Sequence, residues 1–407
     1  MKYIDYVNLN FHPRADDLIC EFLVEPLGID IKLAAGALAA ESSIGTWTET
    51  TTTKSYVEKL HATAFSIDGN SVRIAYPIEL FESGNMPNIL SSVAGNVFGL
   101  GELNNLRLND IQLPAKLVKS FKGPKYGIDG IRKLLGIKKR CLVGTIIKPK
   151  LGLRTEDHAK VAYDAWVGGC DIVKDDENLS SQKFNKFEKR AIQTLKMRDK
   201  AEKLTGEKKV YMVNVTAETN EMIRRANLVE KLGGDYIMVD ALTVGFSALQ
   251  TLRNEDLDLV IHAHRAMHAA ITKNPKHGIS MKVLAKLLRA VGVDQLHAGA
   301  VVGKMSESEE DVRKNCEALK GDMFGLKKVM PVASGGLWAG SVPEILRIFG
   351  NDVVIQAGGG IHGIGTVTGA RAMRQAVDAA MQKIDLKEYS KLHKELRAAL
   401  EKWKGKK

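Results

Sequence analysis

From about residue 142 onward, short apolar runs alternate with stretches of helical periodicity. The runs begin near Leu142, Asp171, Val210, Tyr236, Leu259, Gln295, Val329 and Val353. Segments such as YMVNVT and DVVIQA have the length of a strand and are largely apolar on both faces, which is typical of a parallel sheet. Most of the intervals, such as NEMIRRANLVEKLGG and VPEILRIFG, are amphipathic, and several end at glycine. The pattern predicts eight strand–helix units in succession.

Eight such units between residues 141 and 384 favour an α/β fold with a (β/α)8 TIM barrel, which typically takes about 250 residues. The alternative is an open, doubly wound sheet. That architecture usually has fewer strands, and its phosphate-binding loop follows the first strand rather than the last.

The first 121 residues have a different pattern. Their expected elements are a strand, a helix, a hairpin and a further strand, at residues 18–24, 31–41, 62–77 and 106–113. Strands with helices on one side predict a small α+β domain of ferredoxin-like type. We expect residues 122–140 to form a linker and residues 385–407 to form a charged amphipathic helix after the barrel.

Composition excludes several classes of protein. Of 407 residues, 44% are hydrophobic and 26% charged, which is ordinary for a globular protein and argues against disorder or a fibrous repeat. No run approaches the ~20 apolar residues of a membrane helix, and a polar segment follows Met1, so we expect a cytoplasmic protein without membrane contact. The four cysteines are scattered and contain no C-x-x-C pair, which suggests neither a zinc site nor disulfides.

The formal net charge of +11 has two interpretations. Much of the excess lies after residue 385, where only Tyr389 and Trp403 interrupt the basic residues. This pattern favours a solvated helix over binding to nucleic acid or membrane. A positive excess also favours an anionic small substrate.

Charged and polar residues follow nearly every predicted barrel strand. They include Lys148, Lys150, Lys174, Asp175, Asp176, Glu177, Asn214, Asp240, His264, Arg265, His297 and Ser334. In such barrels the chemistry lies where the strands end. Since these side chains are costly to bury, a purely structural barrel would not place them there.

The segment GGCDIVKDDEN is the most informative of these strand ends. Lys174 and Asp176 are two residues apart and face one side of an extended chain, where Glu177 can join them if the strand turns. Two carboxylates suit Mg²⁺, whereas an ammonium repels a metal. The conflict disappears if the Lys174 amine is neutral and has captured CO2 as a carbamate. The alternative is an ordinary salt-bridged turn.

Two further strand ends carry basic residues. In TIIKPKLGL, Lys148 and Lys150 lie on one face, and like charges favour the neutral amine that proton transfer needs. The alternative is a basic turn facing phosphate or solvent. In HAHRAMH, an Arg265 phosphate clamp with His264 nearby fits better than a zinc site, because no matching ligands exist elsewhere. His262 is expected to be a packed strand residue.

The last strand ends are rich in glycine. The stretch LHAGAVVGKMSESEED predicts a loop that places Lys304 over a developing anion, or else a plain surface loop. Gly358, Gly360 and Gly363 match G-x-G-x-x-G, but no further strand follows as a dinucleotide fold requires. We therefore expect these glycines, with Ser334, Gly335 and Gly336, to donate backbone N–H groups to a phosphate.

Taken in order, these motifs resemble the large subunit of ribulose-1,5-bisphosphate carboxylase/oxygenase. The resemblance includes AAESSIGTWTE and GNVFGL near the N-terminus and spans roughly residues 17–380. The short chain with a reduced C-terminal tail resembles the archaeal form that works without small subunits. The resemblance implies Mg²⁺-dependent addition of CO2, with O2 as a side reaction, to ribulose 1,5-bisphosphate, giving 3-phosphoglycerate.

The resemblance also implies roles for the strand-end residues. The carbamate of Lys174 (N6-carboxylysine) would bind one Mg²⁺ with Asp176 and Glu177 and would remove the C3 proton. Lys148 would protonate the carboxylated product, with Lys150 tuning it and His264 assisting. Lys304 would stabilise the new carboxylate.

Substrate binding is implied by the same resemblance. Arg265 and His297 would bind one phosphate and Ser334 a sugar hydroxyl. The residues implied at the other phosphate are Thr46, Trp47, Gly336, Gly358 and Gly359. Glu41 would steer Lys304, and Asn96 would lie near the metal-bound substrate. Because Glu41, Thr46, Trp47 and Asn96 belong to the N-terminal domain, the resemblance implies a homodimer with shared active sites and allows higher oligomers of such dimers.

Three positions depart from the family pattern, and two other functions remain as alternatives. Ala300, Met305 and Ile44 stand where threonine, leucine and another residue are usual, which bears on lid closure and on discrimination between CO2 and O2.

One alternative is a related protein that only enolises or isomerises a thiomethyl sugar phosphate. Such relatives lack several of the residues present here. The other, a basic nucleic-acid-binding protein, leaves the strand-end charges unexplained.

Overall fold

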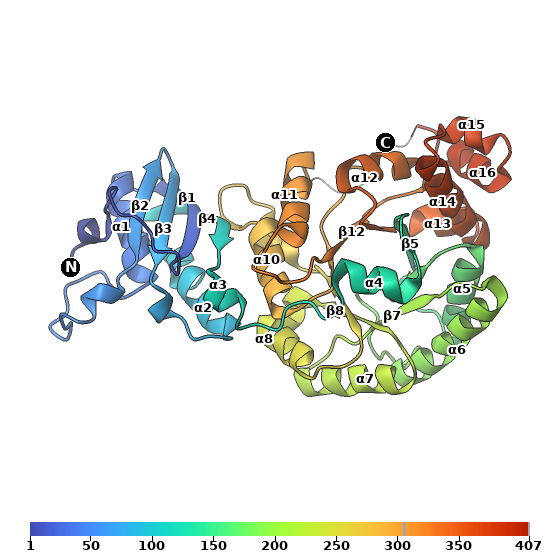
Figure 1. Ribbon diagram of the computed structural model, residues 1–407, viewed down its shortest axis with the longest axis horizontal. Helices are drawn as coiled ribbons and strands as arrows, with labels where there is room; N and C mark the ends of the chain where they lie inside the picture. The colour runs from blue at the N-terminus through green and yellow to red at the C-terminus, as the bar shows by residue number, and fades with distance from the viewer. Residues whose placement is uncertain (304–306, 406–407) are drawn as a thin grey trace. The chain divides into compact units, whose positions relative to one another are not determined.

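The computed structural model describes residues 1–303 and 307–405 (Figure 1). The chain forms two compact units, each of which is described by itself. The first unit comprises Met1–Lys122, Met267–Val291 and Asp322–Leu326. The second comprises Gly123–Ala266, Gly292–Gly321 and Lys327–Lys407.

The first unit contains a five-stranded sheet with the order β10-β4-β1-β3-β2. Its strands are β1 (Leu18–Pro26), β2 (Thr63–Asp68), β3 (Ser71–Tyr76), β4 (Leu103–Gln112) and β10 (Gly278–Ile279). Its helices are α1 (Ile31–Glu41), α2 (Met86–Val93), α3 (Ala115–Val118), α9 (His268–Thr272) and α10 (Met281–Val291). The first four strands pair antiparallel, and β10 adds a short parallel edge to β4.

Local sequence explains the main elements of this unit. Alternate residues of β1, from Leu18 to Val24, are buried, which is the period of a strand with one face on a core. Asp30 caps α1 by accepting from the backbone N–H groups of Lys32 and Leu33 at 2.8 and 3.1 Å. The run from Ala34 to Ala40 in α1 is fully buried. The predicted strand, helix, hairpin and further strand all form.

The second unit contains a closed barrel of eight parallel strands in the described residues, in the order β11-β12-β13-β5-β6-β7-β8-β9. The strands are β5 (Leu142–Ile146), β6 (Ile172–Lys174), β7 (Val210–Asn214), β8 (Tyr236–Asp240), β9 (Val260–His264), β11 (Gln295–His297), β12 (Met330–Ser334) and β13 (Val354–Gln356). All eight predicted runs are barrel strands. The α/β fold with a (β/α)8 barrel is confirmed, and the open sheet is excluded.

The helices of this unit precede, separate and follow the barrel strands in the chain, and α10 of the first unit lies between β9 and β11 in sequence. They are α4 (Gly127–Leu135), α5 (Thr155–Gly168), α6 (Phe187–Thr205), α7 (Thr219–Lys231), α8 (Ala241–Asn254), α11 (Glu309–Lys320), α12 (Val342–Phe349), α13 (Gly359–His362) and α14 (Thr366–Met381). Helix α4 lies within the segment expected to link the domains. Its Ile128, Ile131 and Leu135 pack in one core cluster with the first residues of several barrel strands, including Leu142 and Val210.

The C-terminal segment differs from the single helix predicted for it. It forms two helices, α15 (Leu386–Ser390) and α16 (Lys394–Lys402). Gln375 of α14 accepts a hydrogen bond from the backbone N–H of Leu396 at 2.9 Å, so a tertiary contact replaces the hydrogen bonds of a continuous helix. Tyr389 stacks on His393 between the two helices, with ring centroids 4.0 Å apart.

Two observations bear on the class of protein. In residues 1–303 and 307–405, every helix is too short or too polar to cross a lipid bilayer. The four cysteines are free thiols, and all of them are buried.

Candidate functional site at the strand ends

The centre of the site is the buried amine of Lys174 at the end of β6. The whole residue is 0% exposed. Its Nζ donates to the carbonyl of Asp175 at 2.7 Å and contacts Met238 Sδ at 3.0 Å, and it lies 3.5 Å from Glu177 Oε2. One carboxylate at that distance and a thioether compensate an ammonium poorly, so the surroundings favour the neutral amine.

Burial and neighbouring charges shift the pKa values of Lys174 and of its partner Glu177. Burial lowers the pKa of the Lys174 amine, although the carboxylates of Glu177 and Asp176 act in the opposite direction. Burial alone would raise the pKa of Glu177, but its electrostatic interactions, with Lys174 first among them, outweigh burial and lower that pKa to about 2. Glu177 is therefore an anion at neutral pH beside an amine that tends to lose its proton.

Lys148, at the end of β5, reaches the same place. Its Nζ donates to Asp176 Oδ2 at 2.8 Å, while the side chain of Asp176 is 2% exposed. A Cβ built on Gly358 would lie 3.1 Å from Lys148 Cε, so the loop after β13 also packs against this lysine. Lys150 is exposed to solvent. The charged group in contact with the Lys148 amine is the carboxylate of Asp176.

Asp175 faces away from Lys174 and anchors the loop. Its carboxylate is fully buried. One oxygen accepts from His158 Nε2 at 3.0 Å and Tyr211 OH at 2.6 Å. The other oxygen accepts from Arg190 Nε at 3.1 Å and the Asn214 backbone N–H at 3.0 Å. Burial opposes ionisation, but Arg190 and the other donors outweigh it and hold the pKa of Asp175 well below its usual range.

Asn214, the last residue of β7, fixes the turn that carries the carboxylates. Its side-chain Nδ2 donates to the carbonyls of Asp176, Glu177 and Leu179 at 3.3, 3.2 and 3.0 Å. These bonds hold the backbone on which Asp176 and Glu177 stand. Asn214 was expected near the site because it ends a strand. The structure shows that it positions the loop that carries Asp176 and Glu177.

His264, at the end of β9, lies beside the carboxylates. Its Nδ1 is 3.1 Å from Asp240 Oδ1, and its Nε2 is 3.7 Å from Glu177 Oε2. Asp240, the last residue of β8, orients the ring as a carboxylate commonly does for a histidine that moves a proton. The proton-transfer role expected of His264 is compatible with this arrangement.

A chain of hydrogen bonds links two buried histidines to Ser334. His262 Nδ1 contacts Gln295 Oε1 at 3.0 Å, the Nε2 atoms of His262 and His297 are 3.0 Å apart, and His297 Nδ1 contacts Ser334 Oγ at 2.7 Å. Burial lowers the pKa of both His262 and His297 well below the usual value, so both rings are neutral.

The neutral rings define a direction for this chain. Because the Gln295 oxygen only accepts, His262 donates to Gln295, His297 donates to His262, and Ser334 donates to His297. The Ser334 oxygen is then left as an acceptor for a hydroxyl group. His262 is a buried strand residue, as expected. It also takes part in this chain of hydrogen bonds.

Arg265 is a buried cation with one free donor group. The residue is 6% exposed, and its Nη2 pairs with Glu307 Oε1 at 2.5 Å. Its Nη1 is buried without a hydrogen-bond partner. A buried guanidinium N–H without an acceptor is suited to bind an anion. Glu307 was not predicted from the sequence.

The glycine-rich loops approach one another closely. A Cβ on Gly303 would lie 2.2 Å from the carbonyl oxygen of Gly335, and one on Gly360 would lie 2.2 Å from that of Leu337. Gly335 and Gly336 have φ of +114° and +82°, which side chains rarely adopt. A Cβ on Gly359 would meet nothing within 4 Å, so its backbone is open to a ligand. Lys304 and Met305 lie outside the described residues.

The predicted site residues of the first unit fall into two places. Asn96 Nδ2 donates to Glu41 Oε1 at 3.5 Å, so these two side chains are neighbours. Thr46 and Trp47 follow α1 in a loop, where Trp47 is 81% exposed. Ile44 is half-buried in the same segment, and Ala300 of the second unit is buried.

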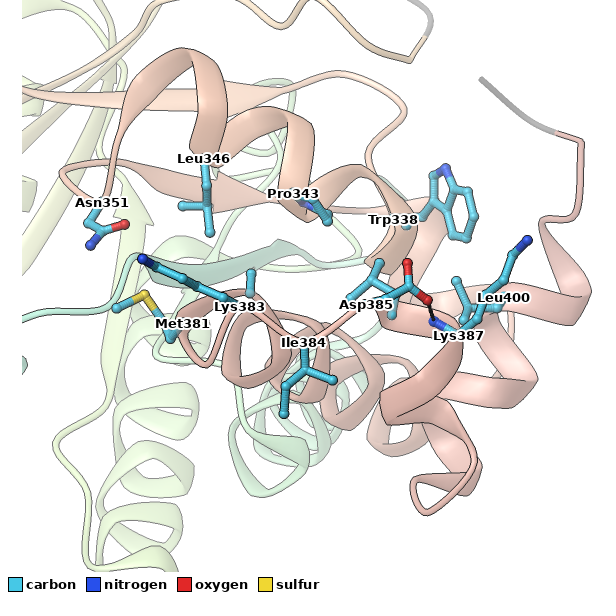
Figure 2. Close-up of a pocket in the computed structure, with 13 residues that line it drawn as sticks. Trp338, Pro343, Leu346, Asn351, Met381, Lys383, Ile384, Asp385, Lys387 and Leu400 are labelled. Atoms are coloured by element: carbon cyan, nitrogen blue, oxygen red, sulfur yellow. Dashed lines mark hydrogen bonds between the residues drawn. The ribbon is translucent and has the colours of Figure 1, made fainter.

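A separate groove lies between α12, the end of α14 and the helices α15 and α16 (Figure 2). Its lining includes Trp338, Leu346, Met381 and Lys383, and none of the predicted site residues. Its carboxylate, Asp385, already accepts from the backbone N–H groups at the start of α15. This groove therefore lacks the converging polar groups of the strand ends.

The carboxylates at the strand ends suit a hard cation, and modification of Lys174 would complete the donor set. In the described part of the chain, no three His, Cys, Asp or Glu side chains gather closely enough to hold a metal ion. Asp176 and Glu177 supply carboxylate oxygens, and a carbamate on Lys174 would supply a third oxygen donor beside them. This set, with positions left for a ligand, is the kind that Mg²⁺ prefers.

Comparisons with known proteins agree over nearly the whole chain. Residues 127–403 match the family model for the ribulose bisphosphate carboxylase large chain, catalytic domain, and residues 5–117 match the model for its N-terminal domain. A protein named ribulose bisphosphate carboxylase from Methanosarcina mazei is 51% identical over 98% of this chain and 99% of its own length. One from Methanocaldococcus jannaschii is 49% identical over 98% and 100%.

Solved structures give the same result. The octameric Rubisco of Pyrococcus horikoshii, determined as a complex with sulfate, superposes with a TM-score of 0.96 at 46% identity and covers 99% of this chain and 97% of its own. A dimeric archaeal Rubisco from Hyperthermus butylicus has a TM-score of 0.92 at 46% identity, with 98% and 99% covered.

Proposed function

Because the chain belongs to the ribulose bisphosphate carboxylase large-chain family, we propose that it adds CO2 to ribulose 1,5-bisphosphate. With one water, the product divides into two molecules of 3-phosphoglycerate. O2 would compete with CO2 for the same intermediate. The observation that carries the proposal is the buried Lys174 amine at the end of β6, 3.5 Å from the Glu177 carboxylate and next to Asp176.

The proposed cofactor is Mg²⁺ held by Asp176, Glu177 and the carbamate of Lys174. When bound, the ion would polarise oxygen atoms of the sugar and make the neighbouring C–H more acidic. Burial supports the carbamate, because the neutral form of an amine is the form that attacks CO2. Asn214 and Asp175 would keep the ligand loop in place through the hydrogen bonds described above.

Proton transfers are assigned to neighbouring residues of this chain. The Lys174 carbamate would remove the C3 proton, and Lys148, tethered to Asp176, would return a proton to the carboxylated product. His264, held by Asp240, would carry protons between them. Lys304, as the family resemblance implies, would stabilise the new carboxylate.

Substrate binding is divided among the strand ends and the N-terminal unit. Arg265 would bind one phosphate with its free Nη1, and the backbone of Gly336, Gly358 and Gly359 would bind the other. Ser334 would accept a hydrogen bond from a sugar hydroxyl. By the same resemblance, Glu41, Thr46, Trp47 and Asn96 would act in the site of a second copy, which makes a homodimer without small subunits the proposed active form.

A labelling assay tests the activity directly. Purified protein is incubated with labelled bicarbonate, Mg²⁺ and ribulose 1,5-bisphosphate, and acid-stable products are separated. We expect labelled 3-phosphoglycerate that forms only when all three are present. Consumption of the sugar without label in phosphoglycerate would contradict the proposal.

A further inference from the structure

The ion pair between Arg265 and Glu307 lies on a residue proposed to bind phosphate. The two side chains are 7% and 19% exposed, and their shortest contact is 2.5 Å. An incoming anion therefore meets a guanidinium whose charge is already balanced. In such shielded surroundings, the contact between opposite charges is stronger than at an open surface.

The backbone around Glu307 is shaped to admit its carboxylate. Gly299 has φ of +113°, and a Cβ there would lie 2.7 Å from Glu307 Oε2. The same oxygen accepts from the backbone N–H of Ala300 at 3.4 Å. The Glu307 carboxylate therefore lies against the backbone of Gly299 and Ala300, just after β11, and contacts Arg265 from there.

We infer that Glu307 is an internal competitor for the anion site at Arg265. In the free protein its carboxylate on Nη2 neutralises the buried guanidinium, so a phosphate group that binds at the free Nη1 gains less from the positive charge and is repelled by Glu307. Glu307 then sets the affinity for the phosphate end of the substrate while taking no part in the chemistry. The inference rests on the proposed phosphate role of Arg265.

The variant Glu307→Gln tests this inference because it keeps an oxygen acceptor for Arg265 and removes the charge. The probe is inorganic phosphate, titrated into the full-length protein by calorimetry at low ionic strength. We expect about tenfold tighter binding than in the wild type, which corresponds to about 1.4 kcal/mol. Glu307→Asp, which retains a more distant charge, should show a smaller gain and serves if the first variant folds poorly.

The matched control is Glu309→Gln, two residues along the chain. Glu309 pairs with Arg313 and Arg347 on the surface, so this variant changes the net charge equally without touching Arg265. Its phosphate affinity should equal that of the wild type. Equal gains in both variants would overturn the inference, since a general charge effect would then explain them.

A third variant separates this inference from the proposed function. Arg265→Met should abolish the phosphate binding that Glu307→Gln strengthens. If Arg265→Met abolishes binding but Glu307→Gln binds no more tightly than Glu309→Gln, the competitor role is wrong and the phosphate role of Arg265 stands. If Arg265→Met retains every phosphate site of the wild type with unchanged affinity, including a site beyond the one proposed at the glycine loops, both are wrong.

Discussion

Replacement of Lys174 with methionine is expected to lower the rate of CO2 fixation by about a thousandfold or more. The substitution keeps an unbranched side chain in the fully buried position but removes the nitrogen that would carry the carbamate. The proposed base and one of three proposed oxygen ligands are lost together. The rate is measured with labelled bicarbonate at saturating Mg²⁺ and ribulose 1,5-bisphosphate.

A second buried lysine of the barrel provides the control. Lys209 is also 0% exposed, but its Nζ donates to the carbonyl of Cys170 and to Glu207, away from the predicted site residues. Lys209→Met should keep its turnover number under conditions where it is folded. If Lys174→Met turned over as fast as Lys209→Met, the assigned role of Lys174 would be wrong.

Replacement of Asp175 with asparagine is expected to lower the free energy of unfolding by about 3–5 kcal/mol. Each carboxylate oxygen of Asp175 accepts from two donors. An amide has one accepting oxygen, so its NH2 group would face one pair of donors, and the fully buried Arg190 would lose its counter-charge. Urea unfolding at neutral pH measures the change.

The same variant should respond differently to pH. The folded state holds the pKa of Asp175 below the unfolded value of about 3.9, so the stabilisation is complete well above that pH and is lost as the pH falls below it. The stability difference between wild type and variant should therefore shrink between about pH 5 and pH 3. A difference that stayed constant over this range would contradict the assigned ionisation.

A solvent-exposed ion pair provides the reference for the loss of stability expected from Asp175→Asn. Asp164 pairs with Lys160 one helical turn earlier on α5, and the lysine is 64% exposed. Asp164→Asn should cost only about 0.5 kcal/mol, as expected for such a helix pair. A similar cost for Asp175→Asn would mean that the buried network contributes little.

The barrel and the centre of its candidate site were predictable from the sequence because both follow from short-range patterns. Eight apolar runs of strand length, separated by helical periodicity, leave few alternatives to a closed barrel. The two-residue period of a strand placed Lys174 and Asp176 on one side. The same period places Asp175 on the opposite side, where it accepts from His158, Tyr211 and Arg190.

The partners of those residues were not predictable, because they come from distant parts of the chain. Arg190 belongs to a highly charged helix whose sequence suggests solvent exposure, yet it is fully buried against Asp175. Glu307 is 42 positions from Arg265 and has no motif that links the two. Gln375 of α14 accepts from the backbone N–H of Leu396 in the first turn of α16, a contact that the local helical pattern does not encode.

The most direct measurement is a crystal structure of the protein grown with Mg²⁺ and bicarbonate. We expect additional density bonded to the Lys174 nitrogen, with the cation ligated by that group, Asp176 and Glu177. An unmodified Lys174 nitrogen in a crystal whose Mg²⁺ lies elsewhere would show that Lys174 does not carry the metal-binding carbamate.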